Sequence, residues 1–99
     1  MGVNTIDAMK TDDANIYIRK VMGGNAGRIR EMRGLSQSEL ARMVDLDRSG
    51  INQFEGGKYN PSVEWLCKLA DGLDVPVVEF FSGLESAPPN RLVGPRCDA

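Results

Sequence analysis

The hydrophobic residues of this chain recur with the spacing of α-helices, and no stretch alternates as a half-buried strand would. Residues 36–44, 47–55 and 62–73 show this spacing most clearly. Within each stretch, apolar residues stand three or four positions apart, which places them on one face of a helix. The residues expected to face inward are Leu40, Ala41 and Val44 in the first stretch, Ile51 and Phe54 in the second, and Val63, Leu66, Leu69, Ala70 and Leu73 in the third.

Polar residues and glycines mark the ends of these three helices. Ser36 stands three residues before Glu39, the spacing of a capping box, in which each residue bonds the backbone N–H of the other. Asp47 and Ser62 are expected to cap the second and third helices. The glycines at 56–57 are expected to end the second helix, because glycine readily adopts the backbone conformation that follows a helix.

Residues 11–34 form a weaker helical segment. Asp12 or Asp13 can cap its first turn, and Gly34 is expected to end it. The glycines at 23, 24 and 27 each cost about 1 kcal/mol relative to alanine in a helix interior. Two alternatives follow: one long, loosened helix, or two pieces broken at Gly23-Gly24. The apolar face of this segment is expected to consist of Ile16, Val21, Ile29 and Met32.

The pattern weakens towards the C-terminus. Residues 75–83 predict a last short helix, with Pro76 near its start and Gly83 after it. Residues 84–99 contain three prolines and little periodicity, so a tail is expected that is disordered or lies across a partner. The predicted fold class is therefore all-α: a compact five-helix domain over 14–83, with an N-terminal arm at 1–13 that can be disordered and a tail at 84–99.

The composition of the chain argues against most classes of enzyme. The chain has 99 residues, 41% of them hydrophobic and 26% charged, which is typical of one small globular domain. It has no histidine and only two cysteines, so the usual Cys/His zinc sites and histidine-activated nucleophiles are excluded. No glycine-rich phosphate loop is present. We therefore expect neither catalysis nor a metal or cofactor. Cys67 is expected in the core, and Cys97 is expected to be a free thiol in the tail.

Charge and hydropathy limit the expected cellular location of the protein and the partners that it can bind. No apolar run approaches the roughly 20 residues of a membrane span, and the N-terminus lacks the features of a secretory signal, so a cytoplasmic protein is expected. The formal net charge is −2. Residues 25–61 carry six basic and five acidic side chains, and residues 62–99 carry three basic and six acidic ones. Nonspecific attraction to a polyanion is therefore expected to be weak and salt-sensitive.

The run IREMRGLSQSELARMVDLDRSGINQFEGGKYNPS, residues 29–62, resembles the lambda-repressor-like helix-turn-helix family, also called the XRE or Cro-type regulators. The likeness continues through VEWLCKLADGLDVPVVEFF, residues 63–81. In the turn between the two central helices, Asp45 stands where the family usually has glycine, at a position that often needs a positive φ. The matching positions are Arg30, Gly34, Leu35, Ser36, Gln37, Leu40, Ala41, Ile51, Glu55, Gly57, Lys58 and Pro61.

The resemblance implies that the helix at about 47–55 enters the major groove of DNA, N-terminus first, while the helix before it crosses the backbone. Arginine can pair with guanine, and glutamine with adenine, through two hydrogen bonds each. The alternative is that the outward polar residues of this helix are merely solvated. The candidate base-contacting residues are Arg48, Ser49, Asn52 and Gln53.

Contacts to the DNA backbone are expected on either side of that helix. The N-terminus of the helix at 36–44 favours an anion, and the resemblance gives Gln37 a phosphate contact. Ser36 either joins that contact or is only a cap. The resemblance also implies a structural ion pair between Arg30 and Glu55. The candidate backbone-contacting residues are Ser36, Gln37, Lys58, Tyr59 and Asn60.

These features predict a sequence-specific DNA-binding transcriptional regulator, expected to act as a repressor. We expect it to bind a palindromic operator in double-stranded DNA as a homodimer, with half-sites about 34 Å apart or a multiple of that distance. The alternative is an antitoxin or other interaction module on the same fold, which binds a partner protein through the acidic C-terminal part. The candidate dimer surface, whose residues can instead close the core of the monomer, consists of Val77, Phe80, Phe81 and Leu84.

Overall fold

The structure, a computed structural model, describes residues 2–84, with side chains described from residue 13 onward. Within this range the chain is helical and contains no strand, which confirms the all-α class. The count of five α-helices is not confirmed, because the last helical segment is a 3-10 helix. The tail from residue 85, including Cys97, lies outside the described residues. The elements are α1 (Gly2–Met32), α2 (Gln37–Val44), α3 (Arg48–Glu55), α4 (Val63–Leu73) and η1 (Val77–Phe81).

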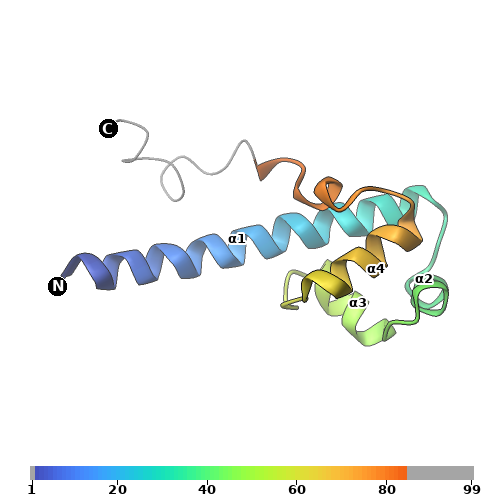
Figure 1. Cartoon of the computed structure of the whole chain (residues 1–99), viewed down its shortest axis with the longest axis horizontal. Coiled ribbons are helices and arrows are strands. Elements are labelled where there is room, and N and C mark those ends of the chain that lie inside the picture. The colour runs from blue at the N-terminus through green and yellow to red at the C-terminus, as the bar shows by residue number, and fades with distance from the viewer. Residues whose placement is uncertain (1, 85–99) are drawn as a thin grey trace.

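The first helix is longer than its sequence pattern predicts. α1 continues through Gly23-Gly24, so the alternative of two pieces is wrong. Asp12 and Asp13 lie inside α1 and therefore do not cap its start. The segment assigned to an N-terminal arm is, from Gly2 on, part of this helix. The N-terminal half of α1 extends beyond the other helices, while α3 and η1 pack against its C-terminal half (Figure 1).

Every helix contributes to one hydrophobic core, which covers only part of the predicted face of α1: Ile29 is buried as predicted, and Val21 is half-buried. Ile16 and Met32 are exposed, because α3 and η1 approach α1 from the side of Met22 and Ala26. Val63 and Cys67 of α4 are exposed too, so their assignment to the core was wrong. The core residues are Met22, Ala26, Ile29, Leu40, Ala41, Ile51, Phe54, Leu66, Leu69, Ala70, Leu73 and Phe80.

Gly23 allows α3 to lie directly on α1. A Cβ atom at Gly23 would overlap the carbonyl oxygen of Phe54, and at Gly27 it would press on the carboxyl group of Glu55. These glycines weaken α1 as an isolated helix, but they let the backbone of α3 come close. The cost in helix propensity is therefore offset by packing between the two helices.

The last helical segment is held to α1 by a buried asparagine. η1 has room for little more than one turn after Pro76, and the N–H of Glu79 bonds back to the Pro76 carbonyl at 2.9 Å, a 3-10 bond. The side-chain amide of Asn25, on α1, donates to the carbonyl oxygens of Phe80 at 2.7 Å and Ser82 at 2.9 Å. Asn25 thus supplies hydrogen bonds to carbonyl groups at the end of η1.

Candidate nucleic-acid interface

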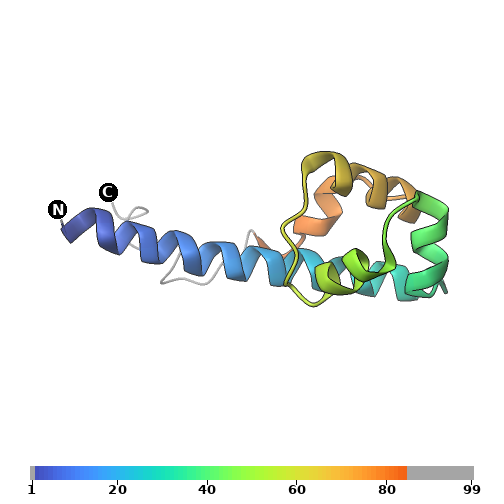
Figure 2. The ribbon, with the colours of Figure 1, turned by 90° about the horizontal axis from the view of Figure 1, so that it is seen from below.

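A tight turn joins α2 to α3. Asp45, at the end of α2, has φ 58° and ψ 49°, as expected for the position usually held by glycine. The N–H of Leu46 then bonds the carbonyl of Ala41 at 3.0 Å and closes the turn. Asp47 occupies the N-cap position of α3, but its side chain makes no capping hydrogen bond, so that part of the prediction was wrong. The turn fixes the direction in which α3 leaves α2 (Figure 2).

α3 divides sharply into a buried and an exposed face. Ile51 and Phe54 are both 0% exposed, and the Phe54 ring contacts the Trp65 ring edge-on at 5.0 Å between centroids. The opposite face carries the four residues predicted to read bases, and all of them are exposed: Arg48, Ser49, Asn52 and Gln53. Gln53 lies one turn after Ser49, with its amide 3.5 Å from the Ser49 hydroxyl.

A shallow groove runs beside the N-terminus of α3. It is lined by Ser38 and Arg42 of α2 and by Arg48 of α3, with the turn residues between them. Arg42 is exposed and carries a second positive charge to this groove. Sequence reasoning missed Arg42, although its position four residues after Ser38 places both on one face of α2.

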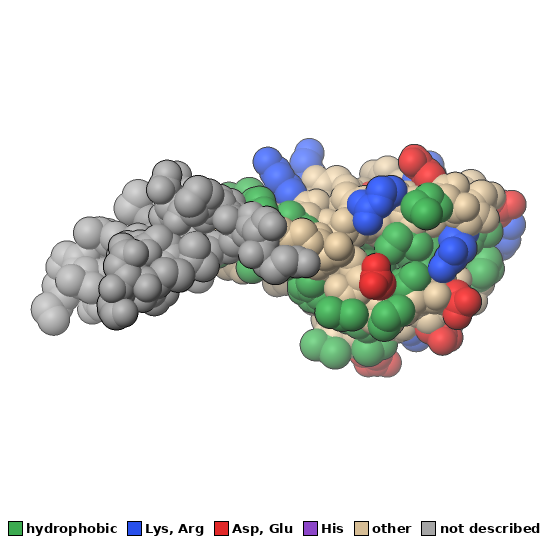
Figure 3. All heavy atoms as spheres, turned by 90° about the horizontal axis from the view of Figure 1, so that it is seen from above, with side chains coloured by type: hydrophobic (Ala, Val, Ile, Leu, Met, Phe, Trp, Pro, Cys, Tyr) green, Lys and Arg blue, Asp and Glu red, His purple; other side chains and the backbone are tan. Residues whose placement is uncertain are grey.

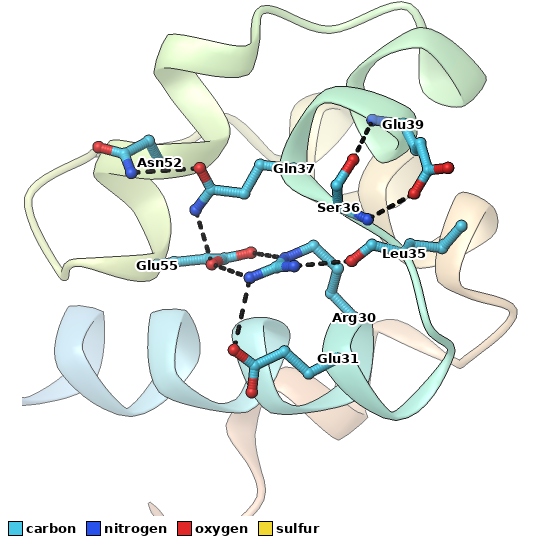
Figure 4. Close-up of polar contacts among 8 residues, drawn as sticks. All are labelled: Arg30, Glu31, Leu35, Ser36, Gln37, Glu39, Asn52 and Glu55. Carbon is cyan, nitrogen blue, oxygen red and sulfur yellow. Dashed lines mark hydrogen bonds and ion pairs between the residues drawn. The ribbon is translucent and has the colours of Figure 1, made fainter.

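The predicted ion pair is present and joins α1 to the end of α3. Arg30 Nε donates to Glu55 Oε2 at 2.7 Å, and Arg30 Nη2 donates to Glu55 Oε1 at 3.0 Å (Figure 4). Arg30 Nη1 also donates to the carbonyl of Leu35 at 2.7 Å. The side chains of Arg30 and Glu55 are 12% and 13% exposed. The hydrogen bonds to Glu55 raise the pKa of Arg30. Because the pair joins α1 to the end of α3 through two hydrogen bonds, its role is structural.

A chain of side-chain hydrogen bonds continues from the ion pair towards the exposed face of α3. Gln37 Nε2 donates to Glu55 Oε1 at 2.9 Å, and Asn52 Nδ2 donates to Gln37 Oε1 at 3.2 Å (Figure 4). Gln37, predicted to contact a phosphate, therefore also bridges α2 and α3. Sequence reasoning did not find this link, because Gln37 and Asn52 are 15 residues apart.

Ser36 and Glu39 form the predicted capping box at the start of α2. The Ser36 hydroxyl accepts from the Glu39 N–H at 3.0 Å, and the Ser36 N–H donates to Glu39 Oε1 at 2.8 Å. The bond that the Ser36 N–H donates to the Glu39 carboxylate is the main cause that lowers the pKa of Glu39. Ser36 therefore acts as a cap, and its contact with a DNA phosphate stays a prediction.

The loop after α3 presents the remaining predicted contacts unevenly. Gly57 has φ 77°, and the N–H of Lys58 bonds the Gln53 carbonyl at 2.9 Å, which ends α3 tightly. Lys58 and Asn60 are exposed. Tyr59 is half-buried, and its ring packs on Trp65 at 4.8 Å between centroids. Only part of the Tyr59 side chain is therefore exposed for a contact.

The candidate dimer surface is only partly available. Phe80 is fully buried, and its ring packs edge-on against the Phe54 ring, with 6.0 Å between the ring centroids. Its assignment to a dimer surface was therefore wrong, and its role is to close the core. Val77, Phe81 and Leu84 are half-buried. Val78, which the sequence did not single out, is exposed. The 3-10 geometry of η1 decides which of these neighbouring residues points outward.

Nothing in residues 13–84 suggests a metal centre, since no group of three or more potential ligands lies together there. No helix in the described part is long and apolar enough to cross a membrane. What the geometry does provide is a helix, a tight turn and a second helix with a row of exposed polar side chains. This arrangement defines a helix-turn-helix domain.

Comparisons with known proteins lead to the same class. A sequence profile of the helix-turn-helix family matches residues 28–80. The relative named "Uncharacterized HTH-type transcriptional regulator y4dJ", from Sinorhizobium fredii, is 32% identical over 71 residues, which cover 72% of this chain and 92% of the relative. The chain therefore belongs to the helix-turn-helix family of DNA-binding transcriptional regulators.

Two solved structures share its fold. The restriction-modification controller protein C.AhdI from Aeromonas hydrophila superposes with a TM-score of 0.62 at 36% identity, covering 64% of this chain and 96% of that one. The controller protein C.Esp1396I, solved as a tetramer in complex with its natural 35 base-pair operator, superposes with a TM-score of 0.62 at 28% identity, covering 71% of this chain and 92% of that one.

Proposed function

We propose that this protein is a sequence-specific transcriptional regulator that reads the major groove of double-stranded DNA with α3. The observation that carries the proposal is the division of α3 into two faces. Ile51 and Phe54 anchor it in the core, and the opposite face exposes four polar side chains that can bond base edges. Arg48 stands at the first position of α3, where a side chain of this motif reaches the bases.

Phosphate contacts flank the reading helix in this proposal. Gln37 lies at the N-terminus of α2, where backbone N–H groups favour an anion. Arg42 and Lys58 supply positive charge on either side of α3. Asn60 and the Tyr59 hydroxyl complete the set. Such contacts hold the register on DNA, while the residues of α3 carry the specificity.

The regulator acts as a homodimer on a palindrome in this proposal. A single helix-turn-helix reads only a few base pairs, and two copies reach successive major grooves when the half-sites lie about 34 Å apart. The tetrameric assembly of C.Esp1396I on its operator supports pairing of this kind. The exposed Val78, together with the half-buried Phe81 and Leu84, is the surface we assign to it.

The test is selection of binding sites from randomised duplex DNA, followed by fluorescence-anisotropy titration of the selected site. We expect an enriched palindrome. Arg48→Ala is expected to relax the preference at one base position per half-site, at a cost of about 1–3 kcal/mol. Lys58→Ala is expected to weaken binding uniformly across sequences. Failure of the wild-type protein to enrich any site would contradict the proposal.

The quaternary and regulatory parts have separate tests. Val78→Asp is expected to shift the protein from dimer to monomer in analytical ultracentrifugation, with Val63→Asp, another exposed valine, as the matched control. Dimers that persist in Val78→Asp would exclude this surface. Repression is tested by a reporter gene placed behind the selected site. The interaction-module alternative stays a prediction, and no observation on residues 2–84 favours it.

A further inference from the structure

In the chain of hydrogen bonds that links Arg30, Glu55, Gln37 and Asn52, each donor and each acceptor is fixed. Arg30 can only donate hydrogen bonds, and the carboxylate of Glu55 can only accept them. Gln37 must therefore turn its amide nitrogen towards Glu55 Oε1, 2.9 Å away. The reversed amide would set two oxygen lone pairs against each other. The ion pair thus determines which end of Gln37 faces α3.

Gln37 passes this orientation on to Asn52. With its nitrogen committed to Glu55, Gln37 presents Oε1 to α3, and Asn52 Nδ2 donates to it at 3.2 Å. The carbonyl oxygen Oδ1 of Asn52 then points away from Gln37 (Figure 4). Asn52 is exposed, in the row that includes Arg48 and Ser49. An isolated surface asparagine could present either end, whereas this one is held in a single orientation.

We propose that Gln37 is a positioning residue that fixes Asn52 with its carbonyl oxygen towards the DNA, so that Asn52 selects a base with an exocyclic amino group. In the major groove only adenine N6 and cytosine N4 are donors, whereas thymine O4 and guanine O6 and N7 are acceptors. This inference rests on the proposed function. It adds a rule of base preference at one position of each half-site.

The first experiment locates that position and tests the amino group. Asn52→Ala is expected to lose base discrimination at a single position of the selected site, which holds adenine or cytosine in the wild-type selection. At that position the base is replaced by an analogue without the amino group, purine for adenine or 2-pyrimidinone for cytosine. The wild-type protein is expected to bind this duplex roughly tenfold more weakly, as for loss of one good hydrogen bond, and Asn52→Ala is expected to bind both duplexes alike.

The second experiment tests the role of Gln37. In Gln37→Leu the amide of Asn52 is free to turn and donate to thymine or guanine. Discrimination against those bases is therefore expected to fall severalfold at the Asn52 position and nowhere else. Lys58→Ala is the control, since loss of a backbone contact lowers affinity without changing base preference. Gln37→Ala repeats the test with a smaller side chain, and thermal unfolding verifies that both variants are folded.

Three results would overturn the inference: thymine or guanine selected at the Asn52 position, no position affected by Asn52→Ala, or unchanged discrimination in both Gln37 variants. Each of them leaves an enriched wild-type site in place, so the proposed function survives. If the wild-type protein enriches no site, the proposed function fails, and the inference fails with it.

Discussion

Gly23 is the residue at which the absence of a side chain matters most to this fold. The backbone of α3 lies so close to α1 that a methyl group at Gly23 would overlap the Phe54 carbonyl oxygen. The neighbouring Gly24 is exposed and has open space around its Cβ position. The two glycines are adjacent in the same helix, but only one of them is required by packing.

The pair makes a matched test. Gly23→Ala is expected to lower the free energy of unfolding by about 2 kcal/mol, because overpacking costs more than the gain in helix propensity. Gly24→Ala is expected to raise it by up to about 1 kcal/mol, because only propensity changes. Urea denaturation of both variants checks this. Equal effects of the two substitutions would show that α3 does not press on α1 at Gly23.

Glu39 gives the capping box a dependence on pH. Its pKa is lowered, first by the hydrogen bond from the Ser36 N–H. A carboxyl group with a lowered folded-state pKa contributes stability that is present above its unfolded-state pKa and is lost as pH falls through the folded-state value. Glutamine can make the same hydrogen bond without titrating.

We therefore expect Glu39→Gln to lose less stability than the wild-type protein between about pH 5 and about pH 3. The two proteins are expected to be similar at pH 7. The measurement is the urea midpoint at each pH. If both proteins lost stability equally, the pKa of Glu39 would not be lower than that of an ordinary glutamate.

At the scale of the elements, the ion pair between Arg30 and Glu55 sets how α3 leaves the core. Both side chains are largely buried, so removal of one strands the charge of the other. Arg30→Met is expected to cost about 3 kcal/mol, and the double variant Arg30→Met/Glu55→Met less than the sum of the single ones. A double-mutant cycle by denaturation measures the coupling. Additive losses would exclude a direct interaction.

Asn25 holds η1 to α1 in a comparable way. Asn25→Ala leaves the carbonyl groups of Phe80 and Ser82 without its amide, at an expected cost of about 1–3 kcal/mol. Asn15→Ala is the matched control, because Asn15 is an exposed asparagine on the same helix. Denaturation and hydrogen exchange at η1 check the effect. Unchanged protection of η1 in Asn25→Ala would contradict the role assigned to Asn25.

At the scale of the whole molecule, binding to DNA has to overcome a net charge of −2. The face seen in Figure 3 carries basic and acidic side chains interspersed with hydrophobic ones, so it has no continuous charge of one sign. On the side of α2 and α3, the cations that border the reading helix are Arg42, Arg48 and Lys58. Specific contacts, rather than bulk charge, must therefore supply most of the affinity.

This charge distribution predicts a modest salt dependence. Arg42 and Lys58, the two cations assigned to phosphates in each protomer, give a slope of log K against log salt of roughly −4 for a dimer. Lys58→Ala is expected to reduce that slope by about 2, one unit per protomer. Arg28→Ala is the control, because Arg28 bonds Asn25 on the side of α1 that faces η1. Anisotropy titrations at several salt concentrations measure the slopes, and equal slopes in Lys58→Ala and wild type would exclude that contact.

The sequence by itself determined the features that depend on neighbours within a few residues. The caps at Ser36 and Ser62 and the end of α3 at the glycines were predicted. A positive φ at Asp45 was expected only from the family resemblance. The caps and the helix end were predictable because a cap or turn satisfies backbone groups three or four residues away. The outward row of α3 was predicted for a similar reason, since a helix of eight residues with two large apolar side chains has one possible inner face.

Only the tertiary structure decided how much of the predicted faces of α1 and α4 is covered, and what the buried polar groups do. The exposure of Cys67 and Val63, the burial of Phe80 and the anchoring by Asn25 depend on where a distant segment packs. The pairing of Gln37 with Asn52 depends on the turn that brings α2 and α3 together. Local pattern limits which residues can be buried, whereas the packing partner selects among them, because burial is a property of the surface that two elements share.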